Sequence, residues 1–291
     1  MERSEIKLYD VSYRAQPISA GSRVETYWLE HFTRLERGIK IRRFNYKNLF
    51  DNNKIVPAAD SPHAIMMYYK LKGFQFGNWV KQIDRVNHFG SCVLALADLR
   101  TLMHSKNIGF DYNIGVAFGA RGRTGAAAHY EPSRMMINLT KQSGAGCLAH
   151  EYGHALDYFF GMRIDVAKGI ASLSNGNSIS RKITPCGGEI RRQMVEILNK
   201  VSSTDSYETW HRYHKKNWAY WGCHTEIFAR CFEQWCCFML RQRKIENTYL
   251  TYPWKYYLDV PSRYLTESDC KKVFPAITKL VALCSKKMNQ K

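Results

Sequence analysis

One stretch, Gly144 to Gly161, most constrains what this chain can fold into. It reads GAGCLAHEYGHALDYFFG and holds His150, Glu151 and His154 in the spacing HExxH. On a helix, residues four apart lie about 40° apart around the axis, so both imidazoles can reach one metal ion. Glu151 then lies beside that ion, where its carboxylate can accept a proton from a water molecule that the metal has acidified. The spacing therefore predicts a Zn²⁺ site and metal-assisted hydrolysis.

The residues around this motif favour a buried helix. Its apolar positions are Leu148, Ala149, Tyr152, Ala155, Leu156 and Phe159. We expect Ser143 to cap the start of the helix and Gly161 to end it. Gly153 in the middle of a helix costs about 1 kcal/mol relative to Ala, which indicates that another element packs closely against that turn.

A third metal ligand is expected from outside this helix. Glu226 and Glu233 lie seven residues apart in a second amphipathic segment that starts at His224, so they share one helical face. Glu226 falls in the first turn, where a metal ion can approach it more freely. Glu233 is expected to pair with Arg230, three residues earlier. We therefore favour Glu226 as the ligand, with a metal-free ladder of these charged residues as the alternative.

Asp157 is a further candidate, because it follows the second histidine by three residues on the same face. However, its short side chain lies about 10 Å along the helix axis from His150. A supporting role, in which Asp157 holds an imidazole or pairs with Arg230, suits it better. A closed structural zinc site would need a fourth protein ligand, for which Cys147 and His129 are the nearest candidates, although a buried thiol is the commoner state of such a cysteine.

Hydrophobic periodicity predicts an α+β fold. The spacing predicts helices over residues 24–37, 61–71, 79–103, 190–201, 224–235 and 273–284, and strands over 114–118, 126–132 and 135–139. Residues 73–79 interrupt the helical pattern. A strand that leads into the HExxH helix suits a small mixed sheet packed by helices, with that helix central. The polar segment 165–188 is expected to be either an exposed loop or a mobile lid.

Composition and net charge restrict the classes of protein to which this chain can belong. With 291 residues and 45% hydrophobic content, the chain is long enough for a real core. No apolar run is long enough for a signal peptide or a membrane span, so we expect a cytoplasmic protein that does not bind membranes. Nine cysteines without a CxxC pair favour free thiols. The net charge of +18 favours non-specific binding to nucleic acid through a basic surface.

Several short motifs together resemble a known family, the metallopeptidase-like large polyvalent protein-associated domain of phages and conjugative elements. They are Gly77-Asn78-Trp79, Phe118 to Gly122, Ala128 to Pro132, Ile137 to Thr140 and the HExxH helix, and the most specific are Leu148 to Asp157 and Glu226 to Arg230. The resemblance runs from about residue 74 to residue 238. It implies a zincin-like fold of gluzincin type in which Glu226 is the third ligand. On this basis residues 73–243 form the zincin-like domain, with helical extensions over 1–72 and 244–291.

Two functions follow. The first is a zinc-dependent endopeptidase of a phage or mobile element, with His150, His154 and Glu226 as ligands and Glu151 as general base. Its partner would be a protein or peptide substrate that aligns on a strand edge. The second is a basic, nucleic-acid-associated protein with a structural or vestigial zinc site. Metal content and a cleavage assay of Glu151→Gln separate the two.

Overall fold

The computed structural model describes residues 62–121, 125–175 and 187–290. It contains a four-stranded sheet made of β1 (Gly73–Phe76), β2 (Gly115–Phe118), β3 (Ala128–Glu131) and β4 (Met136–Leu139). The strand order is β1-β2-β4-β3, in which β1, β2 and β4 run parallel and the edge strand β3 runs antiparallel to β4. The prediction of an α+β protein with a small mixed sheet is therefore confirmed.

The helices described are α3 (Pro62–Tyr69), α4 (Gln82–Met103), α5 (Leu148–Arg163), α6 (Glu189–Ser202), α7 (Asp205–Tyr213), α8 (Trp218–Trp221), α9 (His224–Gln242), α10 (Trp254–Asp259) and α11 (Glu267–Met288), with a 3-10 turn at Lys215–Asn217. Each helix predicted within the described residues is present, and the one predicted over 24–37 lies outside them. Strand β1 differs from the prediction, since it lies in the segment 73–79, where the sequence predicts only an interruption of the helical pattern. Its four residues are all buried, so they show no alternation of apolar and polar side chains.

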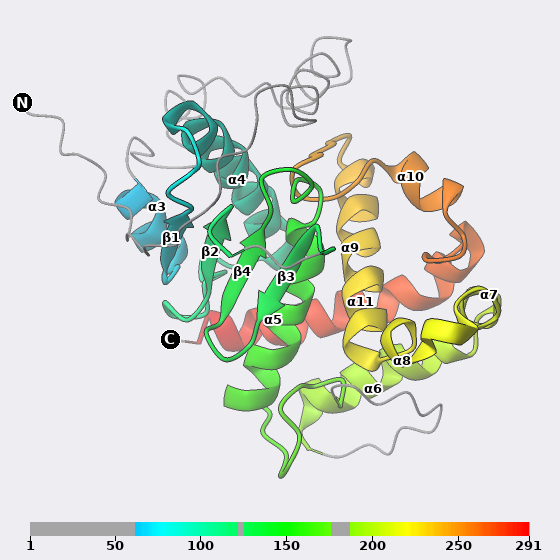
Figure 1. Ribbon diagram of the computed structural model, residues 1–291. Helices are drawn as coiled ribbons and strands as arrows, with labels where there is room; N and C mark the ends of the chain where they lie inside the picture. Colours follow the sequence, from blue (N-terminus) through cyan, green and yellow to red (C-terminus); the bar gives the residue numbers. More distant parts are fainter. Residues whose placement is uncertain (1–61, 122–124, 176–186, 291) are drawn as a thin grey trace, which may run out of the picture.

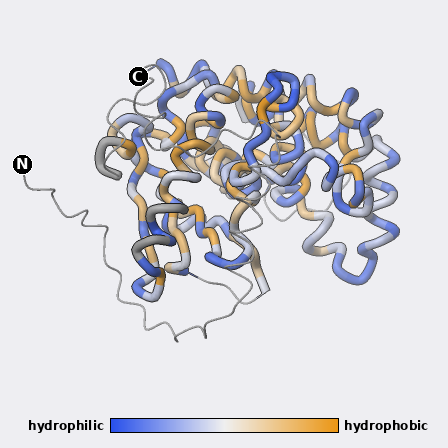
Figure 2. Tube along the Cα trace, turned by 90° about the horizontal axis from the view of Figure 1, so that it is seen from above, coloured by the Kyte–Doolittle hydropathy of each residue, from blue (hydrophilic) through white to orange (hydrophobic). Residues whose placement is uncertain are grey.

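The sheet lies on one side of the molecule and most helices lie on the other, with α5 and α9 between them (Figure 1). Helix α5 packs against β3 and β4 and runs along α9, while α11 packs against α6 and also contacts α9 and α4. Hydrophobic segments lie inside this arrangement and hydrophilic segments lie along its outer turns (Figure 2). Burial of these apolar faces is the main favourable contribution to the stability of the fold.

The predictions that Ser143 caps the HExxH helix and that Gly161 ends it were both wrong. Helix α5 is preceded by Cys147, which makes no side-chain cap hydrogen bond, and the helix continues through Gly161 to Arg163. A Cβ at Gly161 would lie 2.5 Å from the backbone carbonyl carbon of Ser172. This glycine therefore allows the following loop to pass close to the helix, instead of ending the helix.

The polar segment 165–188 is exposed in one described part and packed in another, since Val166, Lys168 and Ala171 are exposed whereas residues 172–174 are packed against the fold. Ser172, Leu173 and Ser174 are fully buried. The buried guanidinium of Arg191 donates hydrogen bonds to the backbone carbonyls of Ser172 and Asp165. These bonds give the segment partners that its composition did not reveal. Residues 176–186 lie outside the described part of the chain.

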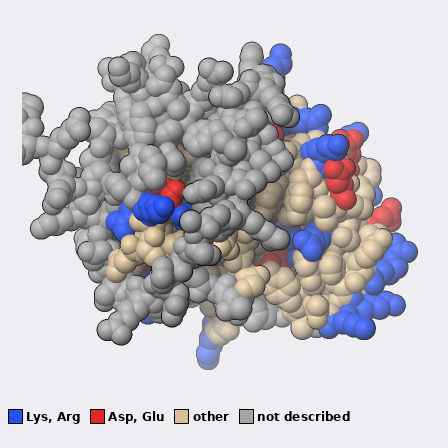
Figure 3. Space-filling view, turned by 45° about the horizontal axis from the view of Figure 1, so that its top comes forward, with Lys and Arg blue, Asp and Glu red and all other residues tan. Residues whose placement is uncertain are grey.

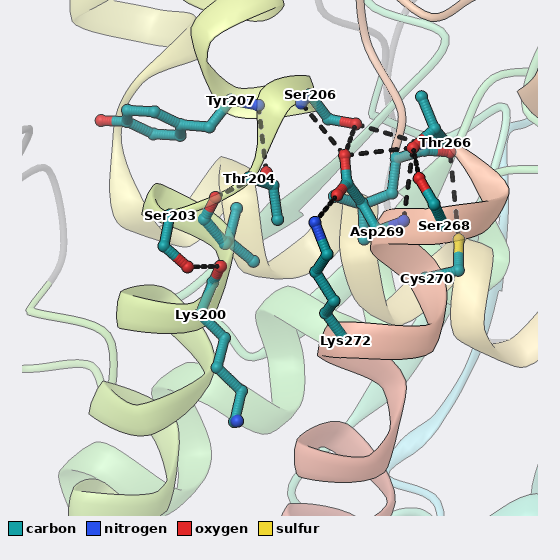
Figure 4. Close-up of polar contacts among 12 residues, drawn as sticks. Lys200, Ser203, Thr204, Ser206, Tyr207, Thr266, Ser268, Asp269, Cys270 and Lys272 are labelled. Atoms are coloured by element: carbon teal, nitrogen blue, oxygen red, sulfur yellow. Dashed lines mark hydrogen bonds and ion pairs between the residues drawn. The ribbon is translucent and has the colours of Figure 1, made fainter.

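A polar network joins the starts of α7 and α11 (Figure 4). One oxygen of Asp269 accepts hydrogen bonds from the backbone N–H of Ser206 at 3.1 Å and from its hydroxyl at 2.7 Å. Thr266 caps α11 by accepting from the Asp269 N–H, and Thr204 caps α7 in the same way through Tyr207. Each cap satisfies a backbone donor that the helix itself leaves without a partner.

The C-terminal helix belongs to the same core as the sheet. Its end contacts the end of α4, where Ser285 donates to the His104 carbonyl and Asn107 donates to the Met288 carbonyl. The largest apolar cluster includes residues on both sides of the predicted boundary at 243/244, such as Leu240 and Leu250. The division into 1–72, 73–243 and 244–291 remains a prediction.

Two further expectations concern the whole chain. The eight cysteines in the described ranges are all free and buried, in agreement with the prediction of free thiols. Among the described helices, none has the length and apolar character needed to cross a bilayer.

Candidate metal centre

The site is formed where α5 and α9 lie against each other. A Cβ added at Gly153 would lie 3.2 Å from the Cα of Ala229 and 3.3 Å from the ring of Phe232. The close packing predicted at this glycine is therefore confirmed, and the packing element is α9. This approach carries the first turn of α9 onto the HExxH face of α5.

Three potential ligands converge there. Ligand atoms of His150, His154 and Glu226 all lie within 4.8 Å of one another. The Nε2 atom of His150 lies 3.5 Å from Oε2 of Glu226, and the Nε2 atom of His154 lies 3.4 Å from Oε1 of the same carboxylate. Two imidazole nitrogens and one carboxylate are donors that zinc prefers, so the residues present fit this metal.

The electrostatics of the cluster keep a negative charge at Glu226. Burial by itself raises the pKa of Glu226, but the hydrogen bonds and charges of His150 and His154 outweigh it and hold that pKa well below its ordinary value. Burial lowers the pKa of His150, whereas its contacts with Glu226 and Glu233 raise it, with a net rise well above the ordinary value. Negative charge around two imidazoles favours a cation at this point.

Glu151 lies in the same turn of α5 and is 4% exposed. Its Oε2 atom is buried and has no hydrogen-bond partner among the described residues. Burial raises its pKa, the opposite direction from Glu226. The two carboxylates therefore differ in character, since Glu226 is held as an anion whereas Glu151 has an unused acceptor and a raised proton affinity.

Glu233 has a different partner from the one expected. Its Oε2 atom lies 3.2 Å from Nδ1 of His150, and its Oε1 atom accepts a hydrogen bond of 2.8 Å from the hydroxyl of Tyr257. It is 1% exposed. The predicted pairing of Glu233 with Arg230 was therefore wrong, because the side chain of Glu233 turns towards α5 and α10.

Asp157 supports the site indirectly. Its carboxylate accepts hydrogen bonds from the backbone N–H and the hydroxyl of Ser174, at 2.9 and 2.5 Å. The carbonyl of Ser174 in turn accepts from Nδ1 of His224, the first residue of α9, at 2.9 Å. Asp157 thus links α5 to the start of α9, two residues before Glu226. Burial raises the pKa of Asp157 to about 6.

Arg230 packs between aromatic rings and makes no ion pair within the described part of the chain. Its guanidinium lies 4.8 Å from the ring centre of Trp221 and 5.6 Å from that of Trp210, and it donates to the Trp221 carbonyl. The pairing of Arg230 with Asp157 that sequence reasoning considered is therefore absent. Its contacts hold α8 against α9.

The two suggested fourth ligands lie outside the three-residue cluster that the described residues form. The thiol of Cys147 lies 3.4 Å from the hydroxyl of Tyr252, and burial raises its pKa to about 12. It is therefore a neutral thiol, in agreement with the expectation of a buried cysteine. His129 lies on strand β3.

Residues 212–288 match the family model of large polyvalent protein-associated domain 1. The matched segment begins in α7 and ends with α11, and it includes Glu226, Glu233 and Tyr257 but not the HExxH helix. The polyvalent-protein part of the resemblance is supported by this match over residues 212–238, and the match continues beyond the predicted range, over residues 239–288. A search of curated proteins found no match, and neither did a search of solved structures.

Proposed function

We propose that this chain is a zinc-dependent peptidase with a zincin-like site of gluzincin type. His150, His154 and Glu226 would hold the metal, and Glu151 would act as general base. The observation that carries the proposal is the convergence of both Nε2 atoms on the Glu226 carboxylate beside a buried, unpartnered oxygen of Glu151. Hydrolysis of a peptide bond needs these two functions, a Lewis acid and a proton carrier, at one place.

The roles of the residues follow from their environments. Zinc held by His150, His154 and Glu226 would supply a Lewis acid, which would polarise the scissile carbonyl and lower the pKa of the attacking water. Glu151 accepts the proton of that water and passes it to the leaving amine, for which its raised pKa suits it. Glu226 stays ionised and neutralises part of the metal charge. Three protein ligands leave a coordination position free for chemistry, as in catalytic zinc sites.

The edge strand β3 provides a place for an extended substrate. It pairs with β4 on one side and contacts α5, the helix that carries both histidines. An extended peptide can add to such an edge through backbone hydrogen bonds. The proposed substrate class is therefore a protein or peptide bound in extended form.

The decisive experiment compares wild type with Glu151→Gln. We expect about one zinc per chain in both proteins, casein cleavage by wild type, and a loss of at least about 100-fold in rate for the variant, because the amide cannot accept a proton. Glu189→Gln, a change in the first turn of α6, is the matched control and should cleave like wild type. Full cleavage by Glu151→Gln would contradict the role of Glu151 as base.

The match to large polyvalent protein-associated domain 1 supports the proposal of a protein from a phage or mobile element. Its proposed location, the cytoplasm of a host cell, remains a prediction from the sequence. A basic, nucleic-acid-associated protein with a structural or vestigial zinc site is the alternative. Exposed aromatic and basic side chains at the end of α7 and before α9 support it, namely Tyr213, Lys215, Lys216 and Tyr220. Zinc without cleavage, combined with strong binding to nucleic acid, would favour this alternative.

A further inference from the structure

We infer that Tyr257 and Glu233 form a hydrogen-bonded relay that orients His150 for metal binding. The inference rests on the proposed zinc site and extends it to α10, outside the two helices that carry the proposed ligands. Tyr257 and Glu233 are accordingly positioning residues, because they act through His150.

The relay is defined by two contacts on opposite oxygens of one carboxylate. Tyr257 donates its hydroxyl proton to Oε1 of Glu233 at 2.8 Å, and Oε2 lies 3.2 Å from Nδ1 of His150. A carboxylate is an acceptor only, so the proton in the second contact belongs to Nδ1. An imidazole with its proton on Nδ1 leaves Nε2 as the atom with a free lone pair. That atom is the one that faces Glu226, at 3.5 Å.

The contacts also distinguish Glu233 from a ligand. The two nitrogens of an imidazole point in different directions, and Glu226 and Glu233 each approach a different one. Glu226 contacts the Nε2 atoms of both histidines, whereas Glu233 contacts Nδ1 of His150. Glu226 is therefore placed to share a metal with His150, and Glu233 is placed behind the ring.

Burial makes the arrangement specific. Glu233 is 1% exposed and Tyr257 is fully buried. Within the described residues, the basic side chain in contact with Glu233 is that of His150, whose Nδ1 lies 3.2 Å from Oε2. A buried carboxylate needs donors and a nearby positive charge, and Tyr257 and His150 provide the donors. A metal cation on the far side of His150 would add positive charge where this carboxylate has little.

The relay also connects the C-terminal part of the chain to the centre. Tyr257 lies on α10 and packs edge-to-face on Tyr264, with ring centres 4.7 Å apart, and its hydroxyl also accepts from the Tyr252 N–H. The position of one metal ligand thus depends on residues 252–264. This dependence gives a physical reason why α9 and α10 occur within one family-matched segment, 212–288.

The test measures zinc affinity by chelator competition on folded, full-length protein. The variants are Tyr257→Phe, Glu233→Gln and the double variant. Tyr152→Phe is the matched control, because Tyr152 is equally buried, lies on α5, and donates a 2.9 Å hydrogen bond away from the site to Ile108. We expect zinc affinity to fall about 10–100-fold in Glu233→Gln and about 3–10-fold in Tyr257→Phe. The control should stay within about twofold of wild type.

The double variant separates a relay from two independent packing effects. If Tyr257 acts through Glu233, the double variant should bind zinc as Glu233→Gln does, with no further loss. Multiplied losses, or wild-type affinity in Tyr257→Phe, would overturn the inference. A second readout is long-range ¹H–¹⁵N NMR of the zinc-loaded protein, which should find the proton of His150 on Nδ1. A proton on Nε2 would contradict the relay.

The relay and the peptidase proposal fail separately. Tight zinc binding without peptide cleavage would remove the peptidase activity and leave the relay, which is judged on affinity and tautomer. Cleavage by wild type together with unaltered zinc affinity in Tyr257→Phe and Glu233→Gln would support the peptidase proposal and overturn the relay. Absence of zinc binding by wild type would overturn both.

Discussion

At the scale of single residues, the candidate centre depends on how four carboxylates differ in their surroundings. Glu226 faces both histidines, Glu233 faces the rear of one of them, Asp157 faces a loop, and Glu151 keeps an oxygen without a partner. The four carboxylates therefore differ in their surroundings, and burial and hydrogen-bond donors shift the pKa of a carboxylate in opposite directions.

The third-ligand assignment gives the first prediction. We expect Glu226→Ala to lose its zinc on dialysis and to bind it at least about 100-fold more weakly than wild type, because the charge shared by both imidazoles is removed. Zinc is measured by atomic absorption on protein whose folding is checked by circular dichroism. Glu196→Ala, a half-exposed residue on α6, should keep the metal. Stoichiometric zinc after dialysis of Glu226→Ala would assign the third ligand elsewhere.

At the scale of elements, the distance between α5 and α9 sets the geometry of the site. Glycine at 153 permits a separation at which Ala229 and Phe232 touch the helix, and any larger residue must push them back. The loop after α5 adds a second connection, from Asp157 through Ser174 to His224.

Gly153→Ala tests this coupling. The added methyl group must displace α9 by a few tenths of an ångström, at a cost of about 1–3 kcal/mol that the better helix propensity of Ala offsets by about 1 kcal/mol. We expect a net loss of about 1 kcal/mol in the free energy of unfolding and weaker zinc binding. Gly73→Ala is the control, because the added methyl group on β1 would meet only the end of the Met66 side chain, at 3.7 Å, and it should leave zinc affinity unchanged. Equal zinc affinity in Gly153→Ala and wild type would refute the coupling.

The junction of α7 and α11 gives a prediction about pH. Burial raises the pKa of Asp269, but hydrogen bonds from Ser206, Lys272 and Thr266 outweigh it and lower the pKa below its ordinary value. Because the pKa of Asp269 is lower in the folded state, its carboxylate stabilises the fold fully at pH values above the unfolded-state pKa, about 3.9. This contribution to the free energy of unfolding disappears as the pH falls through the folded-state pKa.

We expect Asp269→Ala to cost about 2 kcal/mol at pH 7, and less at pH 3, in urea unfolding. Zinc affinity should not change, because the junction lies away from the metal cluster. Glu267→Ala, in the same turn of α11, serves as control and should cost a few tenths of a kcal/mol. A difference in the free energy of unfolding between Asp269→Ala and wild type that increases as the pH falls would contradict the lowered pKa of Asp269.

At the scale of the whole molecule, the positive charge is spread out. On the face shown in Figure 3, the Lys and Arg side chains of the described residues form several separate groups, some of which include acidic side chains. The net charge of +18 gives a general attraction for polyanions.

This charge predicts weak, sequence-indifferent binding to nucleic acid. We expect dissociation constants in the micromolar range or weaker near physiological salt, and a fall in affinity of at least about tenfold between 50 and 200 mM salt, because bound counterions are released. Fluorescence anisotropy with two unrelated oligonucleotides of equal length measures both properties. An affinity that does not change with salt concentration, or that differs strongly between the two oligonucleotides, would contradict this prediction.

The sequence alone was sufficient for the features that depend on local periodicity and spacing. The HExxH helix, the helix that carries Glu226, the strands at 115–118, 128–131 and 136–139 and the close contact at Gly153 were all predicted, because helical and extended periods leave a clear apolar pattern. The convergence of Glu226 on the two histidines was expected from the same helical geometry, together with the family resemblance.

Only the tertiary structure decided which side chains meet across the core. In the structure, Glu233 contacts His150 and Tyr257 and does not pair with Arg230. Arg230 lies between two tryptophan rings. Residues 172–174 pack against Asp157 and Arg191. The contacts of Glu233, Asp157 and Arg191 join residues 17 to 83 positions apart, and the contact of Arg230 with Trp221 joins residues nine positions apart. Hydrophobic periodicity reports which face of an element is buried, but the partner on the other side depends on how distant elements dock.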